Sequence, residues 1–200
     1  MVQTKRQEQK VQTRRKILDT AFRLYAVRGF STPTNIITKE TGLSHGAIFL
    51  HFPTRESLQL QVLENFTREI GDKLHELSKT GGKISDLLYT HIGILEEYES
   101  FYKNLISEIS NLPDGTKTLL IALHSVMSFH FGDVIEKEKK KGRVKKIPLH
   151  MLFNTWLGLL HYYLQNSELF TTGKSVLKNR KDELVKNFVL LISSEGEGKQ

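Results

Sequence analysis

The stretch from Thr34 to Phe52 constrains the fold more than any other part of the chain, because it holds two short helical patterns around one glycine. The first pattern is expected to begin with Thr34 as its cap and to end at Gly42, which tolerates the positive φ of a helix terminus. Ser44 is expected to cap the second pattern. Two short helices joined by a three-residue turn that contains glycine are typical of a helix-turn-helix motif.

The second helix of this motif is expected to carry a recognition surface. A DNA-reading helix meets base edges with the residues near its N-terminal end. The residues that this helix turns outward are His45, Gly46, Ala47, Phe49 and Leu50. Its other apolar positions can pack against the first helix.

Positive charge is concentrated in the same part of the chain. Residues 1–58 contain ten Lys and Arg against four Asp and Glu, an excess of six in a chain whose formal net charge is +7. A basic segment that coincides with a helix-turn-helix pattern favours contact with a phosphate backbone over a merely solvated surface. Residues 1–12 are polar and charged, and we expect them to form a frayed arm that can touch the DNA backbone or the minor groove.

Helical patterns continue through the rest of the chain. We predict a head domain over 1–58, which includes a first helix over 13–28, and a connecting helix over 59–80. Residues 81–200 are expected to form a larger helical domain for ligand binding and dimerisation. Alternation typical of strands is absent from the sequence, so we predict an all-α fold with about nine helices.

Composition excludes several classes of protein. The 200 residues are 38% hydrophobic and include no Cys, so the chain can build a core but has no disulfide framework and no thiolate zinc site. The first residues lack an apolar signal region, and we expect no apolar run near the roughly 18 residues that span a bilayer. We therefore expect a soluble, cytoplasmic protein that does not contact a membrane.

No motif in the sequence indicates an enzyme or a metal site. A helical-bundle metalloenzyme needs Glu-x-x-His pairs that face inward, and the chain contains no such pair. Four histidines, at His124, His130, His150 and His161, do not form a tight ligand set on one helix. We predict no catalytic residue, no metal and no cofactor.

The second domain carries polar and aromatic residues on mostly apolar faces. A lining of this kind suits a small-molecule site, so we expect a largely apolar or aromatic effector. Each residue can instead fill the core or an interface, and that alternative stays open. The candidate effector-binding residues are His91, Tyr98, Tyr102, His124, Met127, Ser128, Phe131, Trp156 and Tyr163, with Gln165 beside them.

Two C-terminal helices carry more apolar surface than a single core-facing stripe requires. They are expected over 148–165 and 175–192. Gly158 lies in the first of them and can allow a close helix crossing. We predict that these two helices form a two-fold, four-helix interface in a homodimer.

The N-terminal sequence has a recognisable order of residues. Residues 13–30 read TRRKILDTAFRLYAVRGF, the helix-turn-helix stretch follows, and 53–58 read PTRESL. This order resembles the DNA-binding domain of the TetR family of bacterial transcriptional regulators, over about the first quarter of the chain. The resemblance implies a three-helix head, a linking fourth helix, and an all-helical C-terminal domain that binds a small effector and dimerises through its last two helices.

The resemblance also implies roles for individual residues. Phe49 stands where the family usually has tyrosine; its ring can pack on the sugar-phosphate backbone but cannot hydrogen-bond a phosphate. Ile37 and Thr41 replace small alanines, which predicts altered packing between the two helices of the motif. The family pattern implies phosphate contacts at Thr34, Ser44, His51 and Arg55, and base-edge contacts at His45, Gly46 and Ala47.

The sequence therefore predicts a homodimeric transcriptional repressor that a small effector releases from double-stranded operator DNA. Two alternatives stay open. One is a DNA-binding regulator that responds to no effector, and the other is a helical-bundle metalloenzyme.

Overall fold

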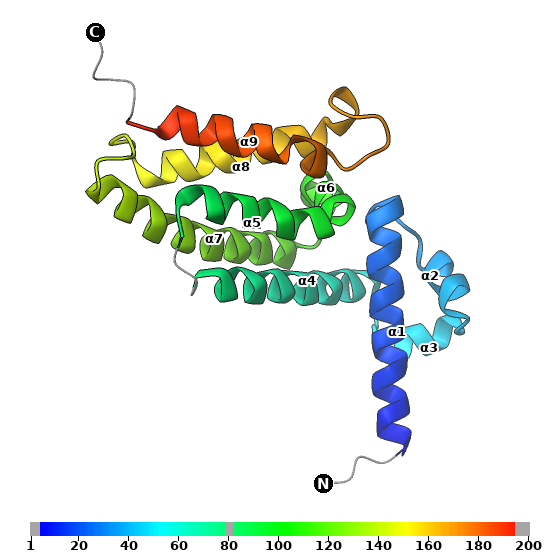
Figure 1. The fold of residues 1–200 in the computed structure, drawn as a ribbon. Helices are drawn as coiled ribbons and strands as arrows, with labels where there is room; N and C mark the ends of the chain where they lie inside the picture. The colour runs from blue at the N-terminus through cyan, green and yellow to red at the C-terminus, as the bar shows by residue number, and fades with distance from the viewer. Residues whose placement is uncertain (1–4, 79–81, 195–200) are drawn as a thin grey trace. The chain divides into compact units, whose positions relative to one another are not determined.

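The fold is all-α, which confirms the predicted class (Figure 1). The computed structural model describes residues 5–78 and 82–194, and the regular structure of these residues consists of nine α-helices, two short 3-10 helices and one isolated antiparallel bridge. The α-helices are α1 (Lys5–Arg28), α2 (Thr34–Thr41), α3 (His45–His51), α4 (Arg55–Ser78), α5 (Ile84–Glu97), α6 (Glu99–Glu108), α7 (Asp114–Lys140), α8 (Leu149–Gln165) and α9 (Val176–Ile192). The 3-10 helices are η1 (Ile109–Asn111) and η2 (Ser167–Leu169), and the bridge joins Val144 to Ser193.

Two compact units divide the chain, and their limits differ from the predicted domain boundaries. The first unit comprises residues 1–67 and 100–119, and the second comprises 68–99 and 120–200, as far as these residues are described. The prediction placed everything after residue 80 in one C-terminal domain. The structure instead groups α6 and the first turn of α7 with the head.

Aromatic packing explains why α6 belongs to the first unit. The ring of Phe101 on α6 stacks on Phe22 of α1, with 4.3 Å between ring centroids. The same ring lies 4.8 Å from Phe66 of α4 and 5.2 Å from Phe30. Each such pair contributes roughly 0.5–1.5 kcal/mol beyond the burial of its area. A helix that supplies the centre of this cluster is therefore part of the head's core.

The end of α1 is fixed by a glycine and an aromatic residue. Gly29 has φ 80°, and its N–H donates to the carbonyl of Tyr25 at 3.0 Å. The ring of Phe30 then stacks on Tyr25 at 4.9 Å, and both side chains are buried. A side chain at Gly29 would be strained at this φ and would collide with the carboxylate of Glu108.

Four side chains hold the turn between α1 and α2. Glu108 at the end of α6 accepts a hydrogen bond from the N–H of Phe30 at 3.1 Å. Arg55 and Gln59 of α4 donate to the carbonyl of Phe30 at 2.6 and 2.9 Å. Asn104 of α6 donates to two carbonyls in the last turn of α1, at 2.8 and 3.0 Å. These bonds tie the start of the helix-turn-helix motif to α4 and α6.

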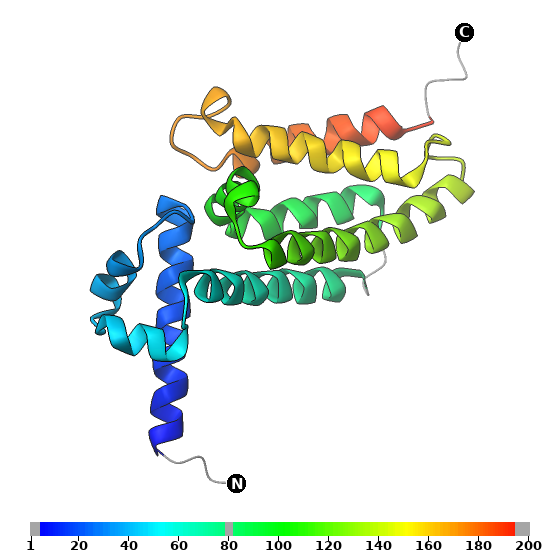
Figure 2. The same ribbon diagram turned by 180° about the vertical axis from the view of Figure 1, so that it is seen from behind.

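In the second unit, α9 lies alongside α5 and α8 (Figure 2). The core of this unit includes Trp156 of α8 and Phe188 of α9, whose ring centroids are 5.1 Å apart and whose side chains are buried. Phe131 of α7 is also fully buried and lies 6.4 Å from Phe188. These rings join three helices around one apolar centre.

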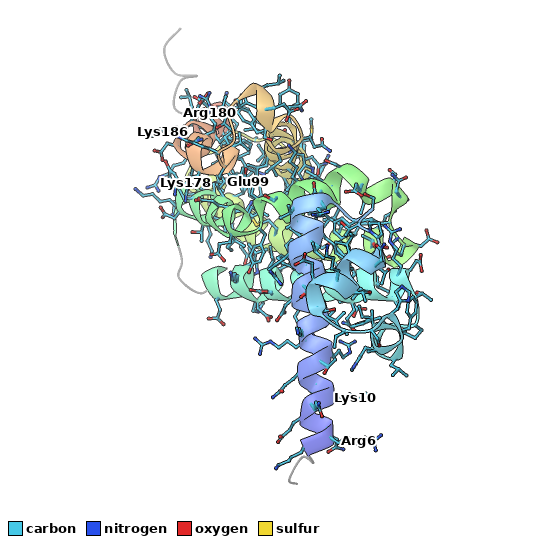
Figure 3. The ribbon with its side chains drawn as sticks, turned by 90° about the vertical axis from the view of Figure 1, so that its right-hand side faces the viewer. Arg6, Lys10, Glu99, Lys178, Arg180 and Lys186 are labelled. Carbon is cyan, nitrogen blue, oxygen red and sulfur yellow. The ribbon has the colours of Figure 1, made fainter. Side chains whose placement is uncertain are left out.

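The N-terminus of α9 is capped from a distant part of the chain. The carboxylate of Glu99, labelled in Figure 3, accepts from the N–H groups of Val176 and Leu177 at 2.8 and 3.3 Å. Ser175 is the N-cap residue, and its hydroxyl accepts from the N–H of Lys178 at 3.0 Å. The two side chains satisfy the donors that the first turn of a helix leaves free, and the negative charge lies at the favourable end of the helix dipole.

One sequence expectation needs correction at α7. This helix is long and apolar enough to cross a membrane by length and composition alone, contrary to the expectation that no run approaches that length. A core helix of a soluble protein passes the same test, and α7 buries Leu123, Met127, Phe131 and Ile135 on one stripe. It also leaves apolar residues exposed, such as Phe129.

Candidate nucleic-acid interface and buried histidine cluster

The turn between α2 and α3 has the geometry that the sequence predicts. Gly42 adopts a left-handed conformation, with φ 66°, and its N–H bonds to the carbonyl of Lys39. Ser44 is the N-cap of α3, and its hydroxyl accepts from the N–H of Ala47 at 3.2 Å. The predicted cap positions of Gly42 and Ser44 are therefore confirmed.

The predicted cap at Thr34 was wrong. Pro33 is the N-cap of α2, and it makes no side-chain cap bond. Pro33 has a φ of −67° and an extended ψ of 146°, as an N-cap residue does. The helix therefore begins one residue earlier than predicted, and Thr34 is its first helical residue. The carbonyl of Thr34 accepts from the hydroxyl of Thr38 at 2.9 Å.

The buried side of the motif fixes the orientation of α3. Ile37 of α2 and Ile48 of α3 are almost fully buried. Phe52 is the C-cap residue of α3, and its side chain is buried as well. Thr41 is buried too, and its hydroxyl donates to the carbonyl of Ile37 at 2.8 Å. This bond explains how a polar residue fits where a small alanine was the family norm, because a buried hydroxyl without a partner is costly.

The opposite side of α3 is open. His45, Gly46, Phe49 and Leu50 are exposed, and the rings of His45 and Phe49 lie 4.7 Å apart. A Cβ added to Gly46 would meet no atom within 4 Å, so nothing in the described protein requires a glycine there. This face combines an imidazole, a bare stretch of backbone and apolar side chains, which together suit base edges and sugar rings.

Cations from α1 lie at the C-terminal end of α3. The sequence did not predict this contact. The guanidinium of Arg14 lies 4.6 Å from the ring centroid of Phe52 and donates to Gln61 at 2.6 Å. Burial lowers the pKa of His51, and the charges of Lys10 and Arg14 lower it further. The polar face of the first helical pattern was visible in the sequence, but its approach to His51 depends on the tertiary fold.

Arg55 has a structural task in addition to its predicted phosphate contact. One of its Nη atoms donates to the carbonyl of Phe30, and its Nε is buried without a hydrogen-bond partner in the structure. It lines a surface cavity of about 410 Å³ together with Gln59, Glu108 and Asn111. A phosphate contact at Arg55 stays a prediction.

Three of the predicted effector-binding residues come together in the second unit. Trp156 Nε1 donates to His91 Nδ1 at 3.0 Å, and both side chains are buried. Because indole can only donate, His91 Nδ1 accepts and the proton of the neutral ring is on Nε2. His124 approaches the same region from α7, and its ring lies 5.7 Å from that of His161.

These imidazoles are held in the neutral state. Burial lowers the pKa of His91 to about 3, with smaller contributions from His124 and His161. Burial and the neighbouring His161 lower the pKa of His124 to about 4, and burial also lowers that of His161. His161 was not among the predicted effector residues, because its approach to His124 depends on how α8 packs against α7.

The remaining predicted effector residues lie in different surroundings. Tyr98 bonds through its hydroxyl to Glu69 and Lys73, and Tyr102 belongs to the first unit, where its ring lies 6.4 Å from Phe66. Met127 and Phe131 are buried in the core of the second unit. Tyr163 stacks on Phe170, and Ser128 lines a surface groove beside Phe129. Among residues 5–78 and 82–194, no group of three or more His, Asp or Glu side chains could hold a metal ion.

The geometry of α2, the glycine turn and α3 defines a protein with a helix-turn-helix domain. Residues 17–62 match the family of bacterial regulatory proteins called the tetR family. YuxN, an HTH-type transcriptional regulator of Bacillus subtilis, is 28% identical over 185 residues, which cover 85% of this chain and 62% of YuxN. Residues 17–62 of this chain therefore form a DNA-binding domain of the tetR type.

Solved structures share the fold over most of the chain. A protein from Saccharomonospora viridis in complex with choline has a TM-score of 0.78 at 20% identity, covering 92% of this chain and all of its own. The regulator FadR from Bacillus subtilis, in complex with stearoyl-CoA, has a TM-score of 0.68 at 12% identity, covering 88% of this chain and 97% of its own. At these identities the likeness concerns the fold.

The neutral imidazoles predict that acid destabilises the second unit. The pKa of His91 is near 3 in the fold against an ordinary value of 6.5, so the unfolded chain binds the extra proton between these values. Stability is thus full above about pH 6.5 and falls as the pH decreases, by up to about 1.4 kcal/mol per pH unit for each such proton.

Urea unfolding measured from pH 7 to pH 4.5 checks this prediction. His91→Gln keeps an acceptor for Trp156 and removes the titrating ring, so its stability should fall less steeply with decreasing pH than that of the wild type. The same substitution at exposed His150 is the matched control. Parallel profiles for the wild type and His91→Gln would contradict the assignment.

Proposed function

We propose that the protein is a DNA-binding transcriptional regulator that reads the major groove with α3. The exposed start of α3, where Gly46 leaves the backbone bare, is the observation that carries the proposal. The chain spans 62% of the length of YuxN. The activity of the whole protein is therefore a proposal and is not inferred from YuxN. A regulator of this kind acts in the compartment that holds the DNA.

The exposed residues of the motif divide into two kinds of proposed contact. His45, Gly46 and Ala47 lie in the first turn of α3 and are proposed to meet base edges. Phe49, on the same exposed face, is proposed to pack on the sugar-phosphate backbone. The proposed phosphate contacts are Thr34, Ser44, His51 and Arg55.

A homodimer through α8 and α9 is part of the proposal. Met151, Gly158 and Tyr162 share one exposed face of α8, at a spacing of seven and four residues. On α9, Leu190 and Leu191 are exposed. A second copy that covers these residues would remove apolar surface from water and place two recognition helices about 34 Å apart for a near-palindromic site.

We further propose that the regulator is a repressor, released from its operator by a small, largely apolar or aromatic effector. The group of buried His91 and Trp156 with half-buried His124 supports this, because neutral imidazoles and an indole suit an uncharged ligand. Two proteins of the same fold were solved with choline and with stearoyl-CoA, so this fold accommodates small molecules. Release requires that the effector bind the DNA-free form more tightly.

An effector-independent regulator is the second candidate, and packing favours it. Trp156 already donates to His91, and Met127, Phe131 and Trp156 are buried against neighbouring side chains. Residues that fill the core in this way do not line a ligand site unless the core opens.

The carrying observation is tested with Gly46→Ala. The added methyl meets no protein atom, and alanine favours a helix by roughly 0.5–1 kcal/mol over glycine, so the fold should be kept. At a base edge the methyl should cost about 1–3 kcal/mol of binding, which is a loss of affinity of roughly 5- to 150-fold.

Binding is measured at fixed salt on a duplex enriched from a random library by the wild-type protein. Gly71→Ala is the matched control, because a Cβ at that position of α4 also meets nothing within 4 Å. Unchanged affinity of Gly46→Ala would contradict the proposed contact between α3 and the base edges. Failure of the wild type to enrich any duplex would refute the proposed function.

The dimer face is tested with Gly158→Arg. The side chain has open space in the protomer, so the helix should form, whereas a buried arginine without a partner should weaken a two-fold interface by several kcal/mol. Sedimentation should then show monomers at concentrations where the wild type is dimeric. Gly71→Arg should stay dimeric, and a dimeric Gly158→Arg would place the interface elsewhere.

The effector is tested through Trp156, the single tryptophan of the chain. Titration with a panel of acyl and aromatic compounds should include a compound that changes Trp156 emission and lowers DNA affinity, with choline as a polar comparison. By linkage, DNA should lower the affinity for that compound by the same factor. A panel that changes neither emission nor DNA binding would favour the effector-independent regulator.

A further inference from the structure

The first part of α1 is a helix without a core to pack on. Residues 1–12 were expected to fray, yet α1 begins at Lys5. The side chains of residues 5–12 are exposed, and Ile17 is the first buried residue of the helix. At 1.5 Å per residue, the segment from Lys5 to Lys16 is about 18 Å long.

This segment, which we call the α1 extension, is strongly basic. It contains six Lys and Arg and a single acid, Glu8. Val11 is its one large apolar side chain, so it lacks the apolar face with which a helix lies on a membrane. Its composition suits a polyanion.

The cations of the α1 extension form a row that begins at the recognition helix. Arg6, Lys10 and Arg14 follow one another at intervals of four residues and therefore share one face of α1. Arg14 fixes the direction of this face, because its guanidinium lies over the ring of Phe52 at the end of α3 and bonds to Gln61 of α4. Figure 3 shows Arg6 and Lys10 on the N-terminal part of the helix.

The opposite face of the same helix has a different character. Arg15 lies there and pairs with Asp19 at 3.7 Å, and Glu8 lies on the same side by helical phase. The positive charge of that face is therefore offset, whereas the row of Arg6, Lys10 and Arg14 contains no acid. After burial, the charges of Lys10 and Arg14 are the causes that lower the pKa of His51, in agreement with the position of Arg14 at the end of α3.

We propose that Arg6 and Lys10 bind phosphates of the DNA that flanks the base pairs read by α3. The proposal rests on the proposed function and extends it. Successive cations in the row are about 6 Å apart along the axis, and the α1 extension is long enough to cover about five further base pairs of each half-site. Because phosphate contacts carry no sequence information, the α1 extension adds affinity without adding base specificity.

Salt dependence tests this proposal with the full chain and a duplex that the wild-type protein has enriched from a random library. Each lost phosphate contact should lower the slope of log affinity against log salt by about 0.9, so Arg6→Ala combined with Lys10→Ala should lower it by about 1.8 per protomer. Both residues are exposed, so circular dichroism should show the helix content of the wild type. Arg6→Lys combined with Lys10→Arg should restore the slope.

Lys5→Ala combined with Lys16→Ala is the matched control, because it removes the same charge from a different side of the same exposed segment. It should change the slope by less than half as much. Duplex length gives a second measure: trimming about five base pairs from each end should lower wild-type affinity to that of the Arg6/Lys10 double variant and leave the double variant unchanged.

Equal salt slopes for the wild type and the Arg6/Lys10 double variant would overturn the proposal. Equal losses in the two double variants would overturn it too, because they would indicate an effect of net charge alone. If the wild type enriches no duplex, the proposed function fails instead, so the two failures are distinguishable.

Discussion

The head depends on the way the backbone of a single residue, Phe30, is held. The N–H of Phe30 donates to Glu108, and its carbonyl accepts from Arg55 and Gln59, so both polar atoms of a half-buried turn are satisfied by side chains from α6 and α4. Without these bonds, the turn that aims α2 would carry unpaired backbone groups beside the buried ring cluster. The angle at which α2 leaves α1, and hence the presentation of α3, follows from this arrangement.

The preferences of individual residues were enough to predict the helix-turn-helix motif. The prediction was wrong at the start of α2, where two neighbouring residues can both take the cap position. Gly42 and Ser44 act at the positions that the sequence indicates, because a left-handed C-cap and a hydroxyl N-cap depend on neighbouring residues only. Thr34 has the right side chain for a cap, but Pro33 sets the preceding backbone and takes that position. The all-α class and the number of helices were equally readable, since apolar periodicity recurs in every segment.

Contacts between distant residues could not be read from the sequence. The membership of α6 in the head depends on Phe101 meeting three other rings, and periodicity identifies an apolar face without its partner. His91 and Trp156 are 65 residues apart, and either could have filled the core separately. Their bond shows that two residues suited to a ligand site already use their polar atoms to bind each other. Composition alone does not reveal such a bond.

The cap that Glu99 gives to α9 has a consequence for the order of folding. Glu99 and Val176 are 77 residues apart in the chain, so the first turn of α9 obtains its acceptor only after a long loop has closed. An isolated helix of 17 residues is marginal in water, and this one lacks its charged cap until Glu99, the first residue of α6, is in place. The stability of the first turn of α9 is therefore coupled to the closure of the loop between Glu99 and Val176, and α9 forms with the tertiary fold rather than ahead of it.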